Sequence, residues 1–475
     1  MFNFNKDQLG IQGVTRPLLK EQSDSADQEI LALSRSEKSW IYFALTIFSF
    51  GVGANEFSAA GLLPQFADAF EISNTQAAYV QSVYALTVAA MGLPVTAFLV
   101  NQPRKRVLAG LSVVFLAGSV TSALAPNYPL LMLGRILSAL PHAPFYGISS
   151  TIVSLMNPGQ EGKAIAIIYL GMTLANIAGT PGATWLARQY SWRFSFWVLA
   201  GIGGSGLLAI LVSAVGKIPR INLDILEEFK DFIKDLKKPG VSLGLLAIAF
   251  GFGGMVAFSG YIAPIMTDVV GFSDNDVPWI AATLGMGFTI GNYLGGKLAD
   301  RNIKATLYGS LMSLAVTLGT MVIMEKYPIP SVIGVFALGA FGFGSAAPLS
   351  RNVIAKGKTD SILVSASTNV AFNAGIAFTV WATGLVIDAD YGYPSAGWMG
   401  AAFTTVGLVM AIASNWFKPE NELKQIAAQS SEVKKREPEA KAVKRTSLFT
   451  TVVSWFNCNR ADSQRDQTTF SPSMK

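Results

Sequence analysis

The sequence contains few residues of the kinds that build metal centres, disulfide frameworks or charged protein surfaces. Cys458 is the only cysteine and His142 the only histidine, so one chain can form neither an internal disulfide nor a Cys/His metal cluster. Only 14% of the 475 residues are charged, against roughly a quarter in an average soluble domain. The first 38 residues lack the apolar core of a cleaved signal peptide. Nor do the apolar parts of the chain offer a nucleophile with a matching base, so we expect no enzyme and no cofactor.

Long apolar runs take up most of the chain instead. Hydrophobic residues make up 51% of the sequence, and they gather in runs of about 20 residues, long enough for a helix to cross a hydrocarbon core of roughly 30 Å. The sequence therefore predicts an all-α integral membrane protein with twelve transmembrane helices. The runs cover residues 40–63, 78–100, 107–125, 128–150, 164–186, 193–215, 242–266, 277–299, 304–324, 330–350, 361–387 and 395–417.

An internal repeat divides these runs into two sets of six. Residues 51–73 and 251–273 have the same length and share two glycines, a proline, an aspartate and a serine at the same offsets. This repeat predicts two six-helix, pseudo-symmetric halves. The predicted segments are an N-terminal cytoplasmic tail at 1–38, a first bundle at 39–216, an amphipathic connector helix at 217–240, a second bundle at 241–417 and a cytoplasmic C-terminal tail at 418–475.

The basic residues follow the membrane topology rather than a binding surface for nucleic acid. The net charge is +6, yet lysine and arginine sit in the loops and tails with no aromatic residues interleaved on one face. If the N-terminus is cytoplasmic, the inner loops hold most of the basic residues, which places both termini inside by the positive-inside rule. Only three lie in the outer loops: Arg188, Arg193 and Lys326.

Three ionisable residues within the apolar runs are candidates for proton coupling. Glu56 lies in the first run, and Arg135 and His142 lie seven residues apart in the fourth, on one helix face. Counted from the outer ends of their runs, Glu56 and Arg135 reach the same depth, so a pairing between them is geometrically reasonable. Acids within a membrane mark proton pathways in many transporters. The alternatives are a permanent structural ion pair for Glu56 and Arg135 and a buried, satisfied imidazole for His142.

Amide side chains within the runs are candidates for a substrate cavity. Asn176 lies in the fifth run, and Asn369 and Asn373 lie one turn apart in the eleventh. These amides can hydrogen-bond a polar substrate or tie neighbouring helices together, and the sequence leaves both readings open.

Two further motifs suggest gating elements. Gly171, Gly179, Pro181 and Gly182 belong to the stretch GMTLANIAGTPG, whose small residues form a groove along one helix face and whose proline bends the helix. In the eighth run, Gly296 precedes Asp300 and Arg301 at the inner surface, where an acid and a base can lock against a neighbouring helix end.

Together, the twelve runs, the six-plus-six repeat and the motifs GGKLADR, GRILSALPHAPFYG and GMTLANIAGTPG resemble the major facilitator superfamily. Residues 40–417 look like its bacterial drug:proton antiporter branch, which contains arabinose-efflux-permease-like, sugar-efflux and purine-efflux proteins. ANEF in the first run and SWRFSFW at 191–197 add to this likeness.

The resemblance implies two halves that rock about a central cavity lined by the first, fourth, seventh and tenth helices. On that pattern Glu56, Arg135 and His142 would face the cavity from the first half, and Met255, Phe258 and Tyr261 would contribute from the second. Asn55, which precedes Glu56 in ANEF, is a further candidate for the substrate cavity. The motif around Pro181 resembles the antiporter motif of the family, which favours export. Two departures concern gating: Asn101 replaces the usual acid of the inner-loop motif, and Ala183 and Thr184 follow Gly182 where further glycine is common.

The sequence thus favours proton-coupled efflux of a small polar molecule, such as a sugar, a nucleoside or a drug, across the bacterial inner membrane. The expected partners are that substrate, protons and the lipid bilayer, with no nucleic acid, and the expected state is a monomer. Two alternatives remain: proton-linked nutrient uptake, and a transport-dead membrane sensor or scaffold that acts through the two tails.

Overall fold

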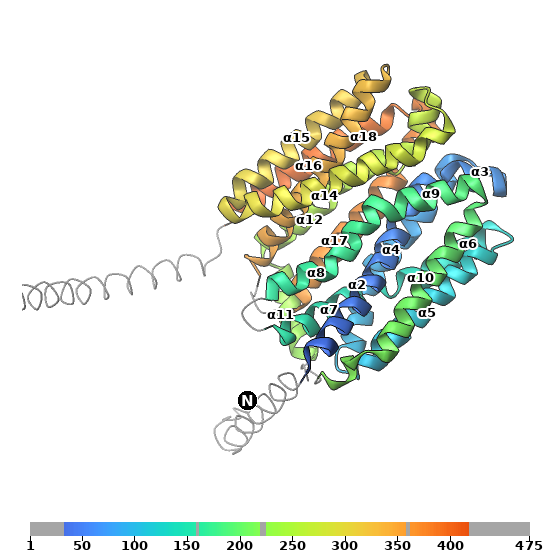
Figure 1. The fold of residues 1–475 in the computed structure, drawn as a ribbon. Helices are drawn as coiled ribbons and strands as arrows, with labels where there is room; N and C mark the ends of the chain where they lie inside the picture. Colours follow the sequence, from blue (N-terminus) through green and yellow to red (C-terminus); the bar gives the residue numbers. More distant parts are fainter. Residues whose placement is uncertain (1–32, 158–160, 219–224, 358–361, 418–475) are drawn as a thin grey trace, which may run out of the picture. The chain divides into compact units, whose positions relative to one another are not determined.

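The computed structural model describes residues 33–157, 161–218, 225–357 and 362–417, and this part of the chain is helical apart from its connections (Figure 1). The predicted tails, except residues 33–38, and residues 219–224 of the predicted connector lie outside the described residues. In the first half the helices are α2 (Arg35–Ser58), η2 (Ala59–Gly61), α3 (Leu63–Phe70), α4 (Asn74–Leu99), α5 (Arg104–Leu124), α6 (Tyr128–Ala139), α7 (His142–Met156), α8 (Glu161–Leu174), η3 (Ala175–Gly179), α9 (Thr180–Gln189), α10 (Trp192–Val212) and η4 (Ala214–Lys217).

The connector and the second half follow the same plan. The core of the predicted connector is the helix α11, whose Phe232 is buried while Leu226 and Ile233 are exposed. The helices are α11 (Ile225–Leu236), α12 (Pro239–Ser259), α13 (Ile262–Pro264), η5 (Ile265–Val269), η6 (Asp274–Asp276), α14 (Val277–Arg301), α15 (Ile303–Met324), α16 (Pro328–Ile354), α17 (Ile362–Val386), η7 (Ile387–Tyr391) and α18 (Ser395–Trp416).

Each of the twelve predicted runs coincides with helix. Within the described residues, eight helices are continuous, long and apolar enough to cross a membrane. The other four runs correspond to α2, to α6 with α7, to α8 with η3 and α9, and to α14. The predicted all-α fold is therefore confirmed, although several spans are interrupted rather than straight.

The interruptions lie next to prolines. A proline within a helix lacks the N–H that would bond the carbonyl four residues earlier, and its ring crowds that carbonyl. Pro141 separates α6 from α7, and the π-helical turn η3 directly precedes Thr180 and Pro181. In the first and seventh spans, the helix is interrupted just before Pro64 and Pro264, which are equivalent positions of the sequence repeat. The two halves thus share an interruption as well as a sequence pattern.

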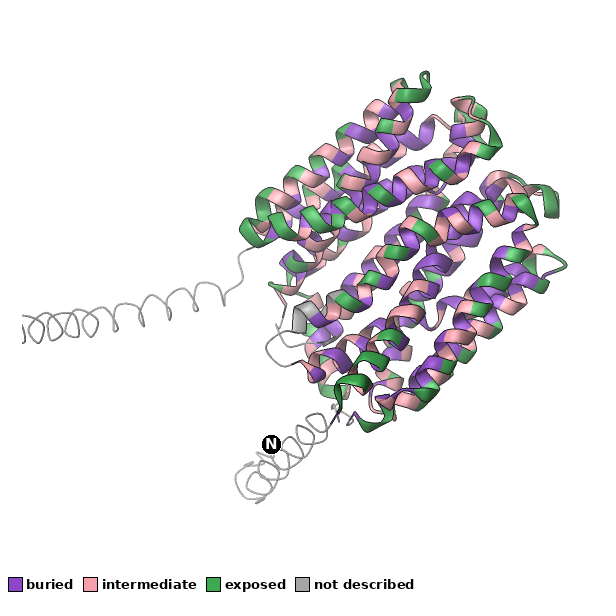
Figure 2. Cartoon of the chain, in the orientation of Figure 1, coloured by how far each residue is buried: buried purple, intermediate pink, exposed green. Residues whose placement is uncertain are grey.

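The surface of the helical unit is apolar where a soluble protein would be polar. Large hydrophobic side chains such as Phe98, Val212 and Trp416 are exposed, and the buried residues face the interior of the bundle (Figure 2). A belt of exposed apolar side chains is the surface that a lipid environment stabilises.

Small residues allow α14 and α16 to pack with their backbones in contact. A Cβ atom on Gly291 would collide with the carbonyl oxygen of Ala340, and one on Gly295 would collide with that of Gly344. Gly296, on the same helix, faces open space. Close backbone approach through glycine is the usual way in which membrane helices gain packing energy.

This packing predicts that Gly291→Ala destabilises the protein and that Gly296→Ala does not. The added methyl group at position 291 forces two backbones apart, with an expected cost of about 1–3 kcal/mol. The thermal unfolding midpoint of the purified protein measures the effect. Equal midpoints for the two variants would contradict the packing described.

Glu325 is a buried acid directly after the last residue of α15. Glu325 is 2% exposed, and neither of its carboxylate oxygens has a hydrogen-bond partner. Burial away from water raises the pKa of Glu325 to about 7, because the ionised form loses its hydration.

We therefore expect the stability of the protein to fall as the pH rises from about 4.5 towards 7. The folded state holds the Glu325 proton in this range and the unfolded state does not, so folding is favoured below it and penalised above it. Glu325→Gln should remove the penalty, which amounts to at most about 3 kcal/mol, and raise the unfolding midpoint at pH 8 but not at pH 4.5. Glu71→Gln, at an exposed acid, is the control. A midpoint at pH 8 that Glu325→Gln leaves unchanged would contradict this assignment.

Candidate functional site

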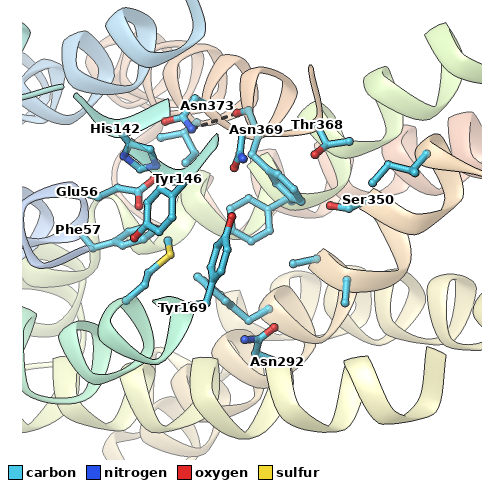
Figure 3. Close-up of a pocket in the computed structure, with 18 residues that line it drawn as sticks. Glu56, Phe57, His142, Tyr146, Tyr169, Asn292, Ser350, Thr368, Asn369 and Asn373 are labelled. Atoms are coloured by element: carbon cyan, nitrogen blue, oxygen red, sulfur yellow. Dashed lines mark hydrogen bonds between the residues drawn. The ribbon is translucent and has the colours of Figure 1, made fainter. Parts of the chain in front are cut away.

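A cavity of about 310 Å³ lies between the two halves and contains side chains from both (Figure 3). It is lined by α2, α7 and α8 from the first half and by α12, α14, α16 and α17 from the second. The lining residues are Glu56, Phe57, His142, Tyr146, Tyr169, Met172, Phe252, Asn292, Phe343, Ala346, Ala347, Ser350, Ile354, Thr368, Asn369, Phe372, Asn373 and Ile376.

Glu56 points into this cavity, and the cavity offers it little compensation. The residue is 4% exposed, and its Oε2 atom has no hydrogen-bond partner. No lysine or arginine is among the described residues that line the cavity. A buried carboxylate that faces an open space without an ion-pair partner is available to a proton or to a ligand.

Arg135 does not pair with Glu56, which corrects the predicted pairing. The Arg135 side chain is fully buried, and its Nη1 donates to the Asn55 backbone oxygen at 2.9 Å and to the Asn55 side-chain oxygen. Its Nε donates to the Val80 carbonyl oxygen at 3.3 Å. Successive side chains on a helix differ in direction by about 100°, so Asn55 faces Arg135 while Glu56 faces the cavity. Asn55, which we placed in the cavity, is not among its lining residues.

Tyr84 joins Arg135 to His142. The Arg135 guanidinium lies 4.6 Å from the centroid of the Tyr84 ring, and the Tyr84 hydroxyl lies 3.1 Å from His142 Nδ1. Both predicted residues therefore contact one side chain of α4, as their spacing along a shared face implies. His142 is the first residue of α7 and lines the cavity, so this chain of contacts leads from the buried arginine to the cavity wall.

Aromatic side chains form much of the remaining wall. The rings of Tyr146 and Tyr169 stack with their centroids 4.9 Å apart, and the Tyr146 hydroxyl lies 3.0 Å from Ser49 Oγ. The rings of Phe288 and Phe343 stack at 4.2 Å, and Phe343 also lines the cavity. Flat aromatic walls bind flat ligands through stacking and apolar contact.

The second half contributes amides and hydroxyls. Asn373 Nδ2 donates to the Asn369 backbone oxygen at 3.1 Å, and Asn373 Oδ1 is buried without a partner. The Tyr169 hydroxyl points towards Asn369 across the cavity (Figure 3). Asn292 lines the wall from α14. An unpartnered amide oxygen beside a cavity can accept a hydrogen bond from a ligand.

Other predicted cavity residues lie elsewhere. Tyr261 is fully buried and its hydroxyl donates to the Val380 carbonyl oxygen at 2.9 Å, so it ties the seventh span to α17. Asn176 lies in η3, and its backbone carbonyl oxygen packs against Gly285 of α14. A Cβ atom on Gly285 would collide with that oxygen. Met255 and Phe258 are buried outside the lining, whereas Phe252 of the same helix lines the cavity.

The glycines of the predicted gating motifs fall into two groups. A Cβ atom on Gly171 would collide with the carbonyl oxygen of Thr46, and one on Gly179 would lie 2.8 Å from Ala54 Cβ, so both glycines pack against α2. Gly182, like Gly296, faces open space, and Pro181 is buried in the first turn of α9.

At the end of α14 that the positive-inside rule places inside, Asp300 forms an ion pair with Arg351 of α16. Both partners belong to the second half, and both are exposed. Of the acid and base predicted in this motif, Asp300 therefore has a defined partner, Arg351. This ion pair links α14 to α16.

Several contacts join the two halves at the end of the bundle that the predicted topology places outside. At the outer end, Asn74 Nδ2 donates to the Tyr393 hydroxyl at 2.9 Å and Thr75 Oγ1 donates to Asp388 Oδ1 at 2.6 Å. Arg188 and Asp274 form a further cross-half ion pair with a 3.4 Å separation. α14 packs on η3 and α9, the outer part of the fifth span. The cavity extends the other way, to Ser350 and Ile354 near the inner end of α16.

Several cavity residues were not predicted. Tyr146 lies one turn after His142 on the same helix, so the helical period alone could have indicated it. Tyr169, Phe252 and Phe372 offered no such signal, because aromatic residues are common in apolar runs and most of them face lipid or the core. Tyr84 carries the contact between Arg135 and His142, and only the fold brings it to that place.

Comparison with known proteins gives the chain a family context. The model of the Major Facilitator Superfamily matches residues 45–357 and 245–474. The inner membrane transport protein YdhP of Escherichia coli (strain K12) is 35% identical over 379 residues, which cover 79% of this chain and 96% of YdhP. The putative transporter AraJ of the same strain is 28% identical over 383 residues, covering 79% of this chain and 92% of AraJ.

Solved structures share the fold at low sequence identity. A bacterial homologue of the human lysosomal transporter Spinster, crystallised in an inward-facing and unoccupied conformation, matches with a TM-score of 0.61 and 16% identity over 81% of this chain and 97% of that chain. A point mutant of the nucleoside transporter NupG matches with a TM-score of 0.63 and 13% identity over 79% of this chain and 99% of that chain. These likenesses establish the arrangement of the helices.

The contact between Asn55 and Arg135 predicts that Asn55→Ala destabilises the protein. The change leaves a buried guanidinium without its side-chain acceptor, at an expected cost of about 1–3 kcal/mol. Asn176→Ala is the matched control, because the Asn176 side-chain oxygen is buried without a partner. Thermal unfolding midpoints of both variants measure the difference, and an equal loss in the two would show that the Asn55 bond is not what holds Arg135.

Proposed function

We propose that this chain, which belongs to the Major Facilitator Superfamily of transporters, exports a small polar molecule in exchange for protons. The chain is a multi-pass membrane protein and a secondary transporter of this superfamily. The direction of transport, the coupling to protons and the class of substrate are the content of the proposal. It assigns the chain to the drug:proton antiporter branch, as a monomer in the bacterial inner membrane with both termini in the cytoplasm.

The observation that carries the proposal is the position of Glu56. Its carboxylate faces a cavity shared by both halves, it has a free oxygen, and no cation is among the described residues that line the cavity beside it. Such a group can hold a proton in one state of the cycle and release it in another, because an apolar, closed cavity favours only the neutral form.

The cycle follows from competition for this one group. In the state described, the cavity reaches the inner end of the bundle, so a cytoplasmic ligand enters while the proton on Glu56 leaves to the cytoplasm. After the halves rock, the ligand departs outside and an external proton neutralises Glu56, which permits the return of the empty carrier. A membrane potential of 100 mV contributes about 2.3 kcal/mol for each charge that crosses. Arg135 stays anchored by Asn55 in this scheme, and its charge acts on Glu56 through space.

The lining supports a preferred class of substrate. The only carboxylate among the described lining residues is Glu56, and no lysine or arginine lines the cavity beside it, so the lining disfavours an anionic ligand. Stacked aromatic rings and the unpartnered Oδ1 of Asn373 favour a neutral or cationic molecule that has a flat ring and hydrogen-bonding groups. Nucleosides and amphenicol-like drugs fit this description better than sugars do.

Glu56→Gln is expected to bind ligand but to lose proton-driven transport, because glutamine keeps the size and polarity of the side chain and cannot release a proton. The measurement is proton release from the purified protein on addition of nucleosides, amphenicols or sugars, followed by efflux driven by a pH gradient in proteoliposomes. Wild-type protein should release protons with the correct ligand, and the variant should release none.

Glu325→Gln is the matched control, since it makes the same chemical change at a buried acid that does not line the cavity. It should retain driven efflux. Unchanged driven efflux in Glu56→Gln would remove Glu56 from the coupling mechanism, and accumulation of ligand that rises with the proton gradient would reverse the proposed direction.

A further inference from the structure

A second concave site lies on the surface of the bundle, away from the central cavity. It is a groove of about 470 Å³ between α4 and α17, with one residue of α6 at its edge. Its lining consists of Tyr79, Ser82, Val83, Leu86, Met132, Ala374, Ala377, Phe378 and Trp381. None of these residues is charged, and the lining is almost entirely apolar. We call this set the seam groove.

Small residues create the seam groove and large ones form its rim. Ala374 and Ala377 lie one turn apart on α17, and Ala377 and Ser82 are each only 9% exposed, which places them at the floor. Leu86, Phe378 and Trp381 are between 44% and 57% exposed, so the rim belongs to the outward-facing surface. The groove is therefore continuous with the apolar exterior that contacts lipid.

The extent of the groove along the helices matches one leaflet of a bilayer. Tyr79 lies five residues, or about 8 Å, from the first residue of α4, and Leu86 lies twelve residues, or about 18 Å, from it. A bilayer core is roughly 30 Å thick, so the groove runs from near the membrane surface to about its middle. Its long direction follows the helices, as a lipid chain does.

We propose that the seam groove holds one acyl chain of a phospholipid from the leaflet at the α3 and η7 end of the bundle. An empty apolar groove at this place would leave its walls without contact partners, and a hydrocarbon chain supplies them. A second copy of the chain is a poorer occupant, because a whole helix cannot enter a groove whose floor lies between two packed helices. This inference does not depend on proton coupling.

The occupant would bridge the two halves. α4 belongs to the first half and α17 to the second, and they pack together along this seam. Thr75 and Asn74 at the start of α4 bond Asp388 and Tyr393 just beyond α17, so the groove lies directly below the outer contacts that close the bundle. A bound acyl chain therefore stabilises the state in which the outer end is closed, and the lipid has to leave or shift when that end opens.

Photolabelling of the wild-type protein tests the proposal. The full chain is placed in nanodiscs that contain a phospholipid with a diazirine in one acyl chain, irradiated and mapped by peptide mass spectrometry. Labels should concentrate on residues 79–86 and 374–381 relative to other exposed apolar positions such as Val316 of α15. Labelling spread evenly over the lipid-facing helices would overturn the proposal.

Ala377→Phe fills the floor of the groove and provides the second arm. Labelling at the seam should fall about tenfold, since the ring displaces several buried methylene groups, whereas Val316→Phe at a lipid-facing position should leave it unchanged. Retained labelling in Ala377→Phe would overturn the proposal. Two other results would also overturn the proposal. If an aromatic drug that the protein transports selectively protects the seam from labelling, the groove is a lateral entry route for that drug. If the seam is protected from labelling only in a dimer, a second copy of the chain covers it.

Discussion

The structure depends on how one buried cation is held in place. Arg135 is fully buried within the first half, and an uncompensated charge in such a place would cost far more than the marginal stability of a folded protein. The helix α2 meets this demand with neutral groups, through the backbone and side chain of Asn55, and the Tyr84 ring covers the guanidinium face. The Nη2 atom of Arg135 has no hydrogen-bond partner. Because neutral groups hold the rest of the guanidinium, the neighbouring carboxylate of Glu56 faces the cavity.

Asn55 holds Arg135 while Glu56 faces the cavity, and this difference between neighbours explains what the sequence could predict. It indicated which residues belong to the site better than it indicated which residues contact one another. Apolar run length and the internal repeat specify the number of helices and their pairing into halves, because the membrane imposes both. Ionisable residues in those runs are rare enough that Glu56 and His142 could be singled out as candidates. Which of two adjacent residues faces a cavity depends on the rotation of a helix about its axis, and uniformly apolar helices carry no periodic pattern that fixes it.

The same limit applies to the second half. Asn369 and Asn373 line the cavity as expected. Tyr261 looked equally suitable, yet its hydroxyl bonds Val380 where the seventh span is interrupted before Pro264. An aromatic residue with one polar atom is satisfied by any nearby carbonyl, so its role is decided by the tertiary packing, which the local sequence does not encode.

The contact between Gly285 and the Asn176 carbonyl has a mechanical consequence. Gly285 lies eight residues from the outer end of α14 and sixteen from its inner end, which correspond to about 12 Å and 24 Å of helix. If the halves turn about this glycine, α14 behaves as a lever with unequal arms. A gap of a given width at the Val277 end then accompanies a movement twice as large at the Arg301 end, so breaking the hydrogen bonds between α4 and η7 accompanies a wide movement at the far end of α14.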